Sequence, residues 1–250
     1  AIIKDHNNYD VKEALAHLEW GEGDEQKALK LFHELKPQKY IENSTYKEIQ
    51  QSNHIPRTKE DVLKEIKKDE IHEGRDFELK TTMYCPVRQK ESGKYGIVDL
   101  HKFSKEKIIP EVVKGIVAFL NTDGGDLIVG IQEKPFKKIY GVETDLEFLG
   151  IARWDDWHNK TSEMIKTQIG SRHMRLVNIK PIEYINEEGS SITLAWIQVS
   201  KGTSSMGLAF LKDGTSFERD NATSPEINAK RMYELMNDRY NQDGKNTILK

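Results

Sequence analysis

AFLNTDGGDLIVGIQE, residues 118–133, is the stretch of sequence that decides the fold. The apolar residues of the segment 109–120 recur at helical spacing, so the stretch opens at the end of an amphipathic helix. Asn121 to Gly125 should end that helix, because glycine adopts the positive φ that such a stop requires. The apolar run 127–131 is typical of a buried strand. The sequence therefore predicts a helix, a glycine turn and a strand, with Glu133 just beyond the strand.

An earlier stretch, EGRDFELK at residues 73–80, has a different period. Apolar and charged residues alternate over its last four positions, so Glu78 and Lys80 should project from the same face of a strand. Phosphodiester hydrolysis with a divalent cation needs carboxylates that converge on the metal and a positive group near the phosphate. Glu73, Glu78 and Glu133 could supply the carboxylates, and Lys80 the positive group. The simpler interpretation of Glu78 and Lys80 is a surface ion pair.

The rest of the chain predicts further helices and strands. A charged helix is expected over about 58–70, a loop or hairpin over 86–103, and another helix around 162–169. A last helix should open with Ser224 as its cap and Pro225 at its first position. The expected later strands are 176–184, 192–199, 207–211 and 215–218. The predicted fold class is α+β, with helices and a mixed, largely antiparallel sheet.

Three parts are expected along the chain. Residues 1–57 should form a small helical extension and a polar linker, because apolar residues at helical spacing near 10–35 give way to a polar segment. The main domain is expected over 58–240, and residues 241–250 as a C-terminal tail. The start at Ala1 rather than at a methionine suggests processing or a fragment of a longer chain.

Composition narrows the class of protein. No apolar run approaches the roughly 20 residues that cross a bilayer, and no charged-then-apolar signal opens the chain, so we expect a cytoplasmic protein with no membrane partner. The single cysteine, Cys85, excludes an internal disulfide and a multi-cysteine zinc site, and is expected to be a small buried hydrophobe. The net charge of −3 does not advertise a nucleic-acid binder, but binding needs only a local basic patch.

An ordered set of motifs resembles the Schlafen AlbA-like domain family. The set begins with Glu73-Gly74-Arg75-Asp76-Phe77-Glu78-Leu79-Lys80 and covers roughly Glu73 to Arg239. Its other members are Ile108-Ile109-Pro110, Ala118 to Gly125, Gly130-Ile131-Gln132-Glu133, Tyr140-Gly141-Val142, Phe217-Glu218-Arg219 and Asn221-Ala222-Thr223. The order of these motifs is far more specific than any one of them.

The resemblance implies a nucleic-acid-binding α+β fold. In nuclease members of the family, three acids form the active site of a metal-dependent endoribonuclease that acts on structured RNA such as tRNA. By motif position, those acids are Glu73, Glu78 and Glu133, with Lys80 beside them and Mg²⁺ or Mn²⁺ as the cofactor. Gly74 stands where the family usually has a serine, and Gln132-Glu133 where it usually has two aspartates. The resemblance also suggests antiviral defence as a setting.

Several basic and aromatic residues are candidates for contact with nucleic acid. Arg219 lies in the motif of the family's final strand and is expected either to face RNA or to be structural. Trp154, Trp157 and His158 could stack on bases, but core or interface packing is the preferred interpretation for tryptophans one turn apart. The other candidates are the basic residues in or beside the 86–103 segment, which are Arg88, Lys90, Lys94, Lys102 and Lys105.

The leading hypothesis is a Schlafen-like endoribonuclease that depends on Mg²⁺ or Mn²⁺. In it, Glu73, Glu78 and Glu133 hold the metal and Lys80 steadies the scissile phosphate, with Asp126 as a reserve ligand. Only one copy of the domain is found, so a homodimer or a second protein is expected to complete the groove. The alternatives are a non-catalytic DNA- or RNA-binding module of a regulatory or defence protein, and an assembly or adaptor protein that acts through the helical extension.

Overall fold

The computed structural model describes residues 57–68, 71–186 and 188–244. The predicted extension and linker over 1–57 therefore lie almost wholly outside the described residues, as do the last six residues of the predicted tail. The domain boundaries stay a prediction. No helix in the described part of the chain is both long and apolar enough to span a bilayer.

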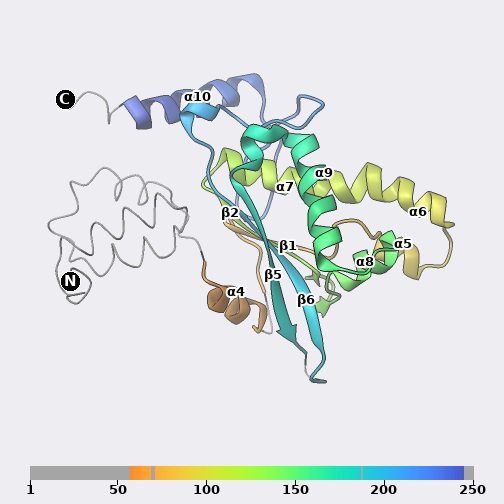
Figure 1. The fold of residues 1–250 in the computed structure, drawn as a ribbon. Helices are drawn as coiled ribbons and strands as arrows, with labels where there is room; N and C mark the ends of the chain where they lie inside the picture. Colours follow the sequence, from red (N-terminus) through yellow and green to blue (C-terminus); the bar gives the residue numbers. More distant parts are fainter. Residues whose placement is uncertain (1–56, 69–70, 187, 245–250) are drawn as a thin grey trace, which may run out of the picture. The chain divides into compact units, whose positions relative to one another are not determined.

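Figure 1 shows helices arranged around a central sheet. The helices are α4 (Lys59–Ile66), α5 (Val87–Glu91), α6 (Ile97–Phe103), the π-helix η3 (Ser104–Ile108), α7 (Ile109–Asn121), α8 (Glu143–Leu149), α9 (Trp154–Met174), the 3-10 helix η4 (Ser204–Met206) and α10 (Ala229–Gly244). The strands are β1 (Phe77–Lys80), β2 (Gly125–Val129), β3 (Ile131–Gln132), β4 (Lys138–Ile139), β5 (Val177–Ile185) and β6 (Ser191–Val199).

The main sheet has the strand order β1-β2-β6-β5. β1 runs parallel to β2, whereas β2 with β6 and β6 with β5 are antiparallel. β3 and β4 form a separate two-stranded hairpin. The prediction of an α+β fold with a mixed, largely antiparallel sheet is confirmed, and β1 lies at one edge of it.

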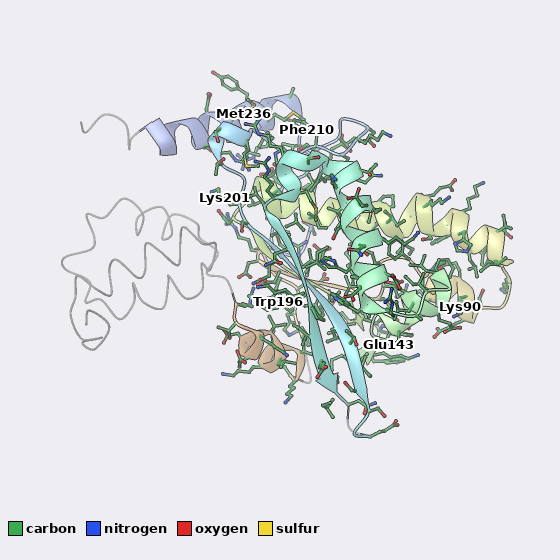
Figure 2. The ribbon with its side chains drawn as sticks, in the orientation of Figure 1. Lys90, Glu143, Trp196, Lys201, Phe210 and Met236 are labelled. Atoms are coloured by element: carbon green, nitrogen blue, oxygen red, sulfur yellow. The ribbon has the colours of Figure 1, made fainter. Side chains whose placement is uncertain are left out.

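The two faces of the main sheet bury different clusters. One face, with Leu127 and Ile197, belongs to a core that includes α7 and α9. The other face, with Ile128 and Trp196, packs against the apolar side of α4. Figure 2 labels Trp196 beside that helix. Residues paired in β1 and β2 share a face, so Glu78, opposite Leu127, lies on the α7 side of the sheet.

The predicted stop after the long helix is confirmed. α7 ends at Asn121, and the N–H of Gly124 donates to the carbonyl of Phe119 at 3.0 Å while Gly124 adopts a φ of 85°. A Cβ at Gly125 would lie 2.4 Å from the Phe119 ring, so only glycine lets β2 start this close to the helix. The glycine pair thus turns the chain directly from α7 into β2.

Three local predictions are wrong. The segment expected as a loop or hairpin, 86–103, contains the short helices α5 and α6. The strands expected at 207–211 and 215–218 are irregular, with one isolated bridge between Phe217 and Glu226. The last helix begins at Ala229 rather than near Ser224, because residues 225–227 hydrogen-bond to 216–218. Asn228 caps it instead, by accepting from the N–H of Arg231 at 2.9 Å.

Asp145 on α8 braces the turn that follows β1. Its fully buried carboxylate accepts from the backbone N–H groups of Met83, Tyr84 and Cys85 at 2.8–2.9 Å. It also accepts from the indole N–H of Trp157 at 3.3 Å. A carboxylate can accept all four bonds because both of its oxygens are acceptors. One side chain therefore ties β1, α8 and α9 together.

Asp145→Asn should destabilise the fold. An amide has only one acceptor oxygen, so at least one buried N–H loses its partner and faces another donor, at a cost of about 2–4 kcal/mol. Urea unfolding should show this loss. The matched control, Asp155→Asn on the exposed start of α9, should cost no more than about 1 kcal/mol. Equal stability of the two variants would contradict the bracing role of Asp145.

Candidate functional site

Glu78 is a buried acid held between two cations. Its side chain is 6% exposed, with Oε1 2.5 Å from Lys80 Nζ and Oε2 2.6 Å from Arg219 Nη1. A Cβ at Gly115 of α7 would lie 2.7 Å from the same Oε2, so the helix backbone approaches the carboxylate closely. A buried charge is tolerated only when it is paired and hydrogen-bonded, and Glu78 meets both conditions.

Arg219 joins Glu78 to the backbone around Glu73. Its guanidinium is 1% exposed, and Nε and Nη2 donate to the carbonyl of Gly74 at 3.1 and 2.9 Å. Nη2 also donates to the carbonyl of Phe77 at 3.3 Å, and the group lies 5.1 Å from the centre of the Phe119 ring. This one cation therefore holds both the turn after Glu73 and the carboxylate of Glu78.

The end of α7 positions the segment that carries Arg219. The Asn121 amide donates to the carbonyls of Ala209 and Phe217 at 2.9 Å, and its oxygen accepts from the N–H of Ala209 at 2.8 Å. Thr122 Oγ1 accepts from the N–H of Arg219 at 2.8 Å. These bonds give the helix-ending run 121–125 a structural role, because they link it to Arg219, almost one hundred positions later in the chain.

Glu73 lies along the free edge of β1. Its Oε1 accepts from the N–H of Leu79 at 2.8 Å, which satisfies a backbone donor of that edge strand. Burial is the main cause that raises the pKa of Glu73, and the charges of Glu78 and Glu133 raise it further. The Leu79 N–H and the charge of Lys80 act in the opposite direction. Glu73 therefore lies within electrostatic reach of both other predicted acids.

Glu133 follows the short strand β3. The N–H of Gly130 donates to the carbonyl of Lys80 at 2.8 Å, so the chain leading to Glu133 starts beside the end of β1. The Glu133 side chain is 20% exposed, and Oε2 lies 3.4 Å from the Nζ of Lys134. The three acids and Lys80 are thus gathered at one end of the parallel β1–β2 pair.

The donor set matches a divalent cation in its chemistry, since carboxylate oxygens are the ligands that Mg²⁺ and Mn²⁺ prefer. Among the described residues, however, no group of three or more acidic, histidine or cysteine side chains is arranged to hold a metal. Each predicted carboxylate instead has a partner within the chain: the Leu79 N–H for Glu73, two cations for Glu78, and Lys134 for Glu133. Metal binding would require these carboxylates to exchange partners.

The predicted basic candidates of the 86–105 segment differ in their surroundings. Arg88 is exposed on α5, and its Nη2 lies 3.4 Å from the carbonyl of Lys134, beside Glu133. Lys90 pairs with Glu147 of α8 at 2.9 Å. The remaining three are exposed, with Lys94 between α5 and α6, Lys102 on α6 and Lys105 on η3.

The other candidates from the sequence make contacts inside the fold rather than at the surface. Arg219 is buried in the contacts above, which favours its structural interpretation over direct contact with nucleic acid. Asp126 lies on the α4 side of the sheet, which is the other face from Glu78, and its carboxylate accepts from the indole N–H of Trp196 at 2.7 Å. Trp157 is fully buried and its ring stacks on Trp154 at 5.2 Å, so the preferred prediction of packing is confirmed. Cys85 is buried, as expected.

Sequence reasoning missed Gly115 and the support that Arg219 gives to Glu78. It also missed the basic hairpin after Glu133, although KPFKK at residues 134–138 is a compact cluster of lysines around an aromatic residue. That cluster could have marked a candidate nucleic-acid contact from the sequence alone. Gly115 could not have been recognised in this way, because its role depends on Glu78, in a strand 37 positions earlier in the chain.

Comparison with known proteins gives one family and a weak structural likeness. The family model described as "Schlafen, AlbA_2" matches residues 73–228. No curated protein matches the sequence. The crystal structure of the DIP2311 protein from Corynebacterium diphtheriae is similar at a TM-score of 0.41 and 15% identity, over 78% of this chain and 32% of that one.

The family model spans more than half of the chain, from Glu73 through the segment that carries Arg219. Its matched region contains the three acids, Lys80 and the glycine turn. Family membership supports a nucleic-acid-related function. The chain belongs to the Schlafen, AlbA_2 family.

Proposed function

We propose that the protein is a metal-dependent endoribonuclease that cleaves structured RNA such as tRNA. The observation that carries the proposal is the gathering of Glu73, Glu78, Glu133 and Lys80 at the end of β1. Beyond the effect of burial, the charges of Glu78 and Glu133 raise the pKa of Glu73, because both repel the Glu73 carboxylate. A divalent cation bound among the three carboxylates would relieve this repulsion. The preference for RNA rests on the resemblance to nuclease members of the family.

The residues have different roles in this proposal. Glu73 and Glu133 are the less buried acids and can turn toward a cation, whereas Glu78 is held by Arg219. Lys80, whose side chain is 23% exposed, places its Nζ 2.5 Å from Glu78 and would steady a scissile phosphate bound beside that carboxylate. A bound Mg²⁺ or Mn²⁺ would polarise the phosphate and lower the pKa of the attacking water. Arg219 is a positioning residue, because it touches Glu78 and the Gly74 carbonyl.

A second candidate function is binding of nucleic acid without cleavage. The observation that favours it is the neutralisation of Glu78 by two cations within the chain, which leaves the acid stable without metal. An adaptor role through the helical extension concerns residues outside the described part of the chain.

Cleavage assays should separate the two functions. With tRNA and Mn²⁺, Glu73→Gln and Glu133→Gln should each lower kcat by roughly 100-fold or more, because the amide removes a charged metal ligand. Glu133→Asp should stay active, since it restores the residue usual in the family. EDTA should abolish wild-type cleavage. Glu163→Gln, an exposed substitution on α9, is the matched control and should cleave normally.

Glu78 is a poor choice for this assay. Its loss would leave the buried Arg219 charge unpaired, at a cost of about 3–5 kcal/mol, so lost activity could reflect unfolding. Cleavage that survives EDTA and both glutamine variants would refute the proposed enzyme. If the wild-type protein binds RNA but cleaves it neither with nor without metal, the non-catalytic module would be favoured.

The titration of Glu73 provides a readout that does not depend on activity. The pKa of Glu73 is raised in the folded protein, so the folded state binds this proton more tightly than the unfolded chain does. The resulting stabilisation of the fold is fully present below the unfolded pKa and is lost as the pH rises through the folded pKa. Carboxyl NMR should show a midpoint above the usual range of a glutamate. Mg²⁺ should lower the midpoint, because it competes with the proton. Glu133→Gln should lower the pKa without metal, since it removes one of the charges that raise it.

Glu163→Gln is the control for this titration and should leave the Glu73 signal unchanged, because α9 contributes none of the causes of the shift. A Glu73 midpoint that neither Mg²⁺ nor Glu133→Gln moves would contradict a shared metal site.

A further inference from the structure

The hairpin after Glu133 presents an aromatic ring to solvent. β3 and β4 pair through Ile131 with Ile139 and Gln132 with Lys138, and residues 133–137 connect them. Phe136 on this connection is 66% exposed. Its neighbour Lys134 has a side chain that is 81% exposed. A large exposed phenylalanine loses the stabilisation of burial unless something covers it.

The connection is anchored, so its exposure is not that of a loose loop. Lys137 Nζ donates to the carbonyls of Ile66 and Lys68 at 3.1 and 2.6 Å. Gln132 Nε2 donates to the carbonyl of Phe136 at 3.4 Å, and the base of the hairpin is closed by the N–H of Tyr140 bonding to Gly130 at 2.8 Å. The Phe136 backbone is therefore held while its ring points away from the core.

Positive charge is concentrated on the hairpin that carries this ring and on the neighbouring Arg88. Three lysines lie at 134, 137 and 138, and Arg88 reaches the Lys134 carbonyl, which makes four cations. Two carboxylates lie among them: Glu133 beside Lys134, and Glu91 at 3.5 Å from Lys138. The hairpin keeps an excess of two positive charges even though the whole chain has a net charge of −3.

We propose that this hairpin is a stacking platform for one unpaired nucleotide of a bound nucleic acid. The Phe136 ring stacks on the base, while Lys134 and Lys138 contact the flanking phosphates. The inference rests on the proposed function, because Glu133 is the first residue of the β3–β4 connection, which places the stacked base next to the acidic site. Lysine is depleted at protein–protein interfaces, which argues against a protein partner on this surface.

Binding in EDTA tests the platform without cleavage. Fluorescence anisotropy would compare a short single-stranded RNA with an abasic strand of the same length and phosphate count. Phe136→Ala should raise the Kd for the base-bearing strand about tenfold and leave the Kd for the abasic strand unchanged, because only the first can stack. Phe136→Trp should bind as tightly as the wild type.

Two further variants complete the design. Lys134→Ala should weaken binding to both the base-bearing and the abasic strand. It should also reduce the slope of log Kd against log salt by about one, as expected for the loss of a phosphate contact. Tyr233→Ala on α10 is the matched control, because it removes an aromatic ring that is 69% exposed, and it should change neither Kd. Thermal unfolding should show the same Tm for Phe136→Ala and the wild type within a few degrees.

The outcomes separate this inference from the proposed function. Wild-type binding that Phe136→Ala leaves unchanged, or weakens equally on both strands, overturns the platform alone. A wild-type dimer that Phe136→Ala converts to a monomer with unchanged RNA affinity would assign the ring to a protein interface and likewise overturn it. A wild type that binds neither strand would refute the proposed function and the platform together.

Discussion

The buried ion pair between Glu78 and Arg219 is the interaction on which the candidate site depends. It joins β1 to a segment 141 residues later in the chain. Loss of Glu78 would leave the buried Arg219 charge unpaired, and an unpaired ion in a protein interior costs several kcal/mol. The pair therefore requires β1, the end of α7 and the 216–219 segment to be in place together.

The rest of the site follows from this constraint. Arg219 holds the Gly74 carbonyl, which keeps the turn after Glu73 folded back along the edge of β1. Gly115 lets α7 close over Glu78, and the Gly124-Gly125 turn places β2 beside β1. Glu73 therefore lies within electrostatic reach of Glu78 and Glu133, and, beyond the effect of burial, the charges of both raise its pKa.

Local sequence patterns were sufficient for some of this arrangement. The helix, glycine turn and strand of 109–131 follow from periodicity and glycine chemistry, and alternation placed Glu78 and Lys80 on one face. Arg219 could not be placed in this way, because its partners are set by tertiary packing. The helices in 86–103 were missed because they are short and leave Ile97 and Val98 exposed, so no apolar stripe marks them. The start of α10 was misplaced because Pro225 joins a bridge rather than a helix.

A double-mutant cycle of Arg219 and Glu78 tests the central claim most directly. Urea unfolding would give the stability of Arg219→Gln, Glu78→Gln and the double variant. Glu78→Gln should lose about 3–5 kcal/mol, because it leaves the buried Arg219 charge unpaired. Arg219→Gln should lose less, because Lys80 still pairs with Glu78. The double variant should lose less than the sum of the two by at least about 1 kcal/mol. Additive losses would show that Glu78 and Arg219 act independently and would contradict the account.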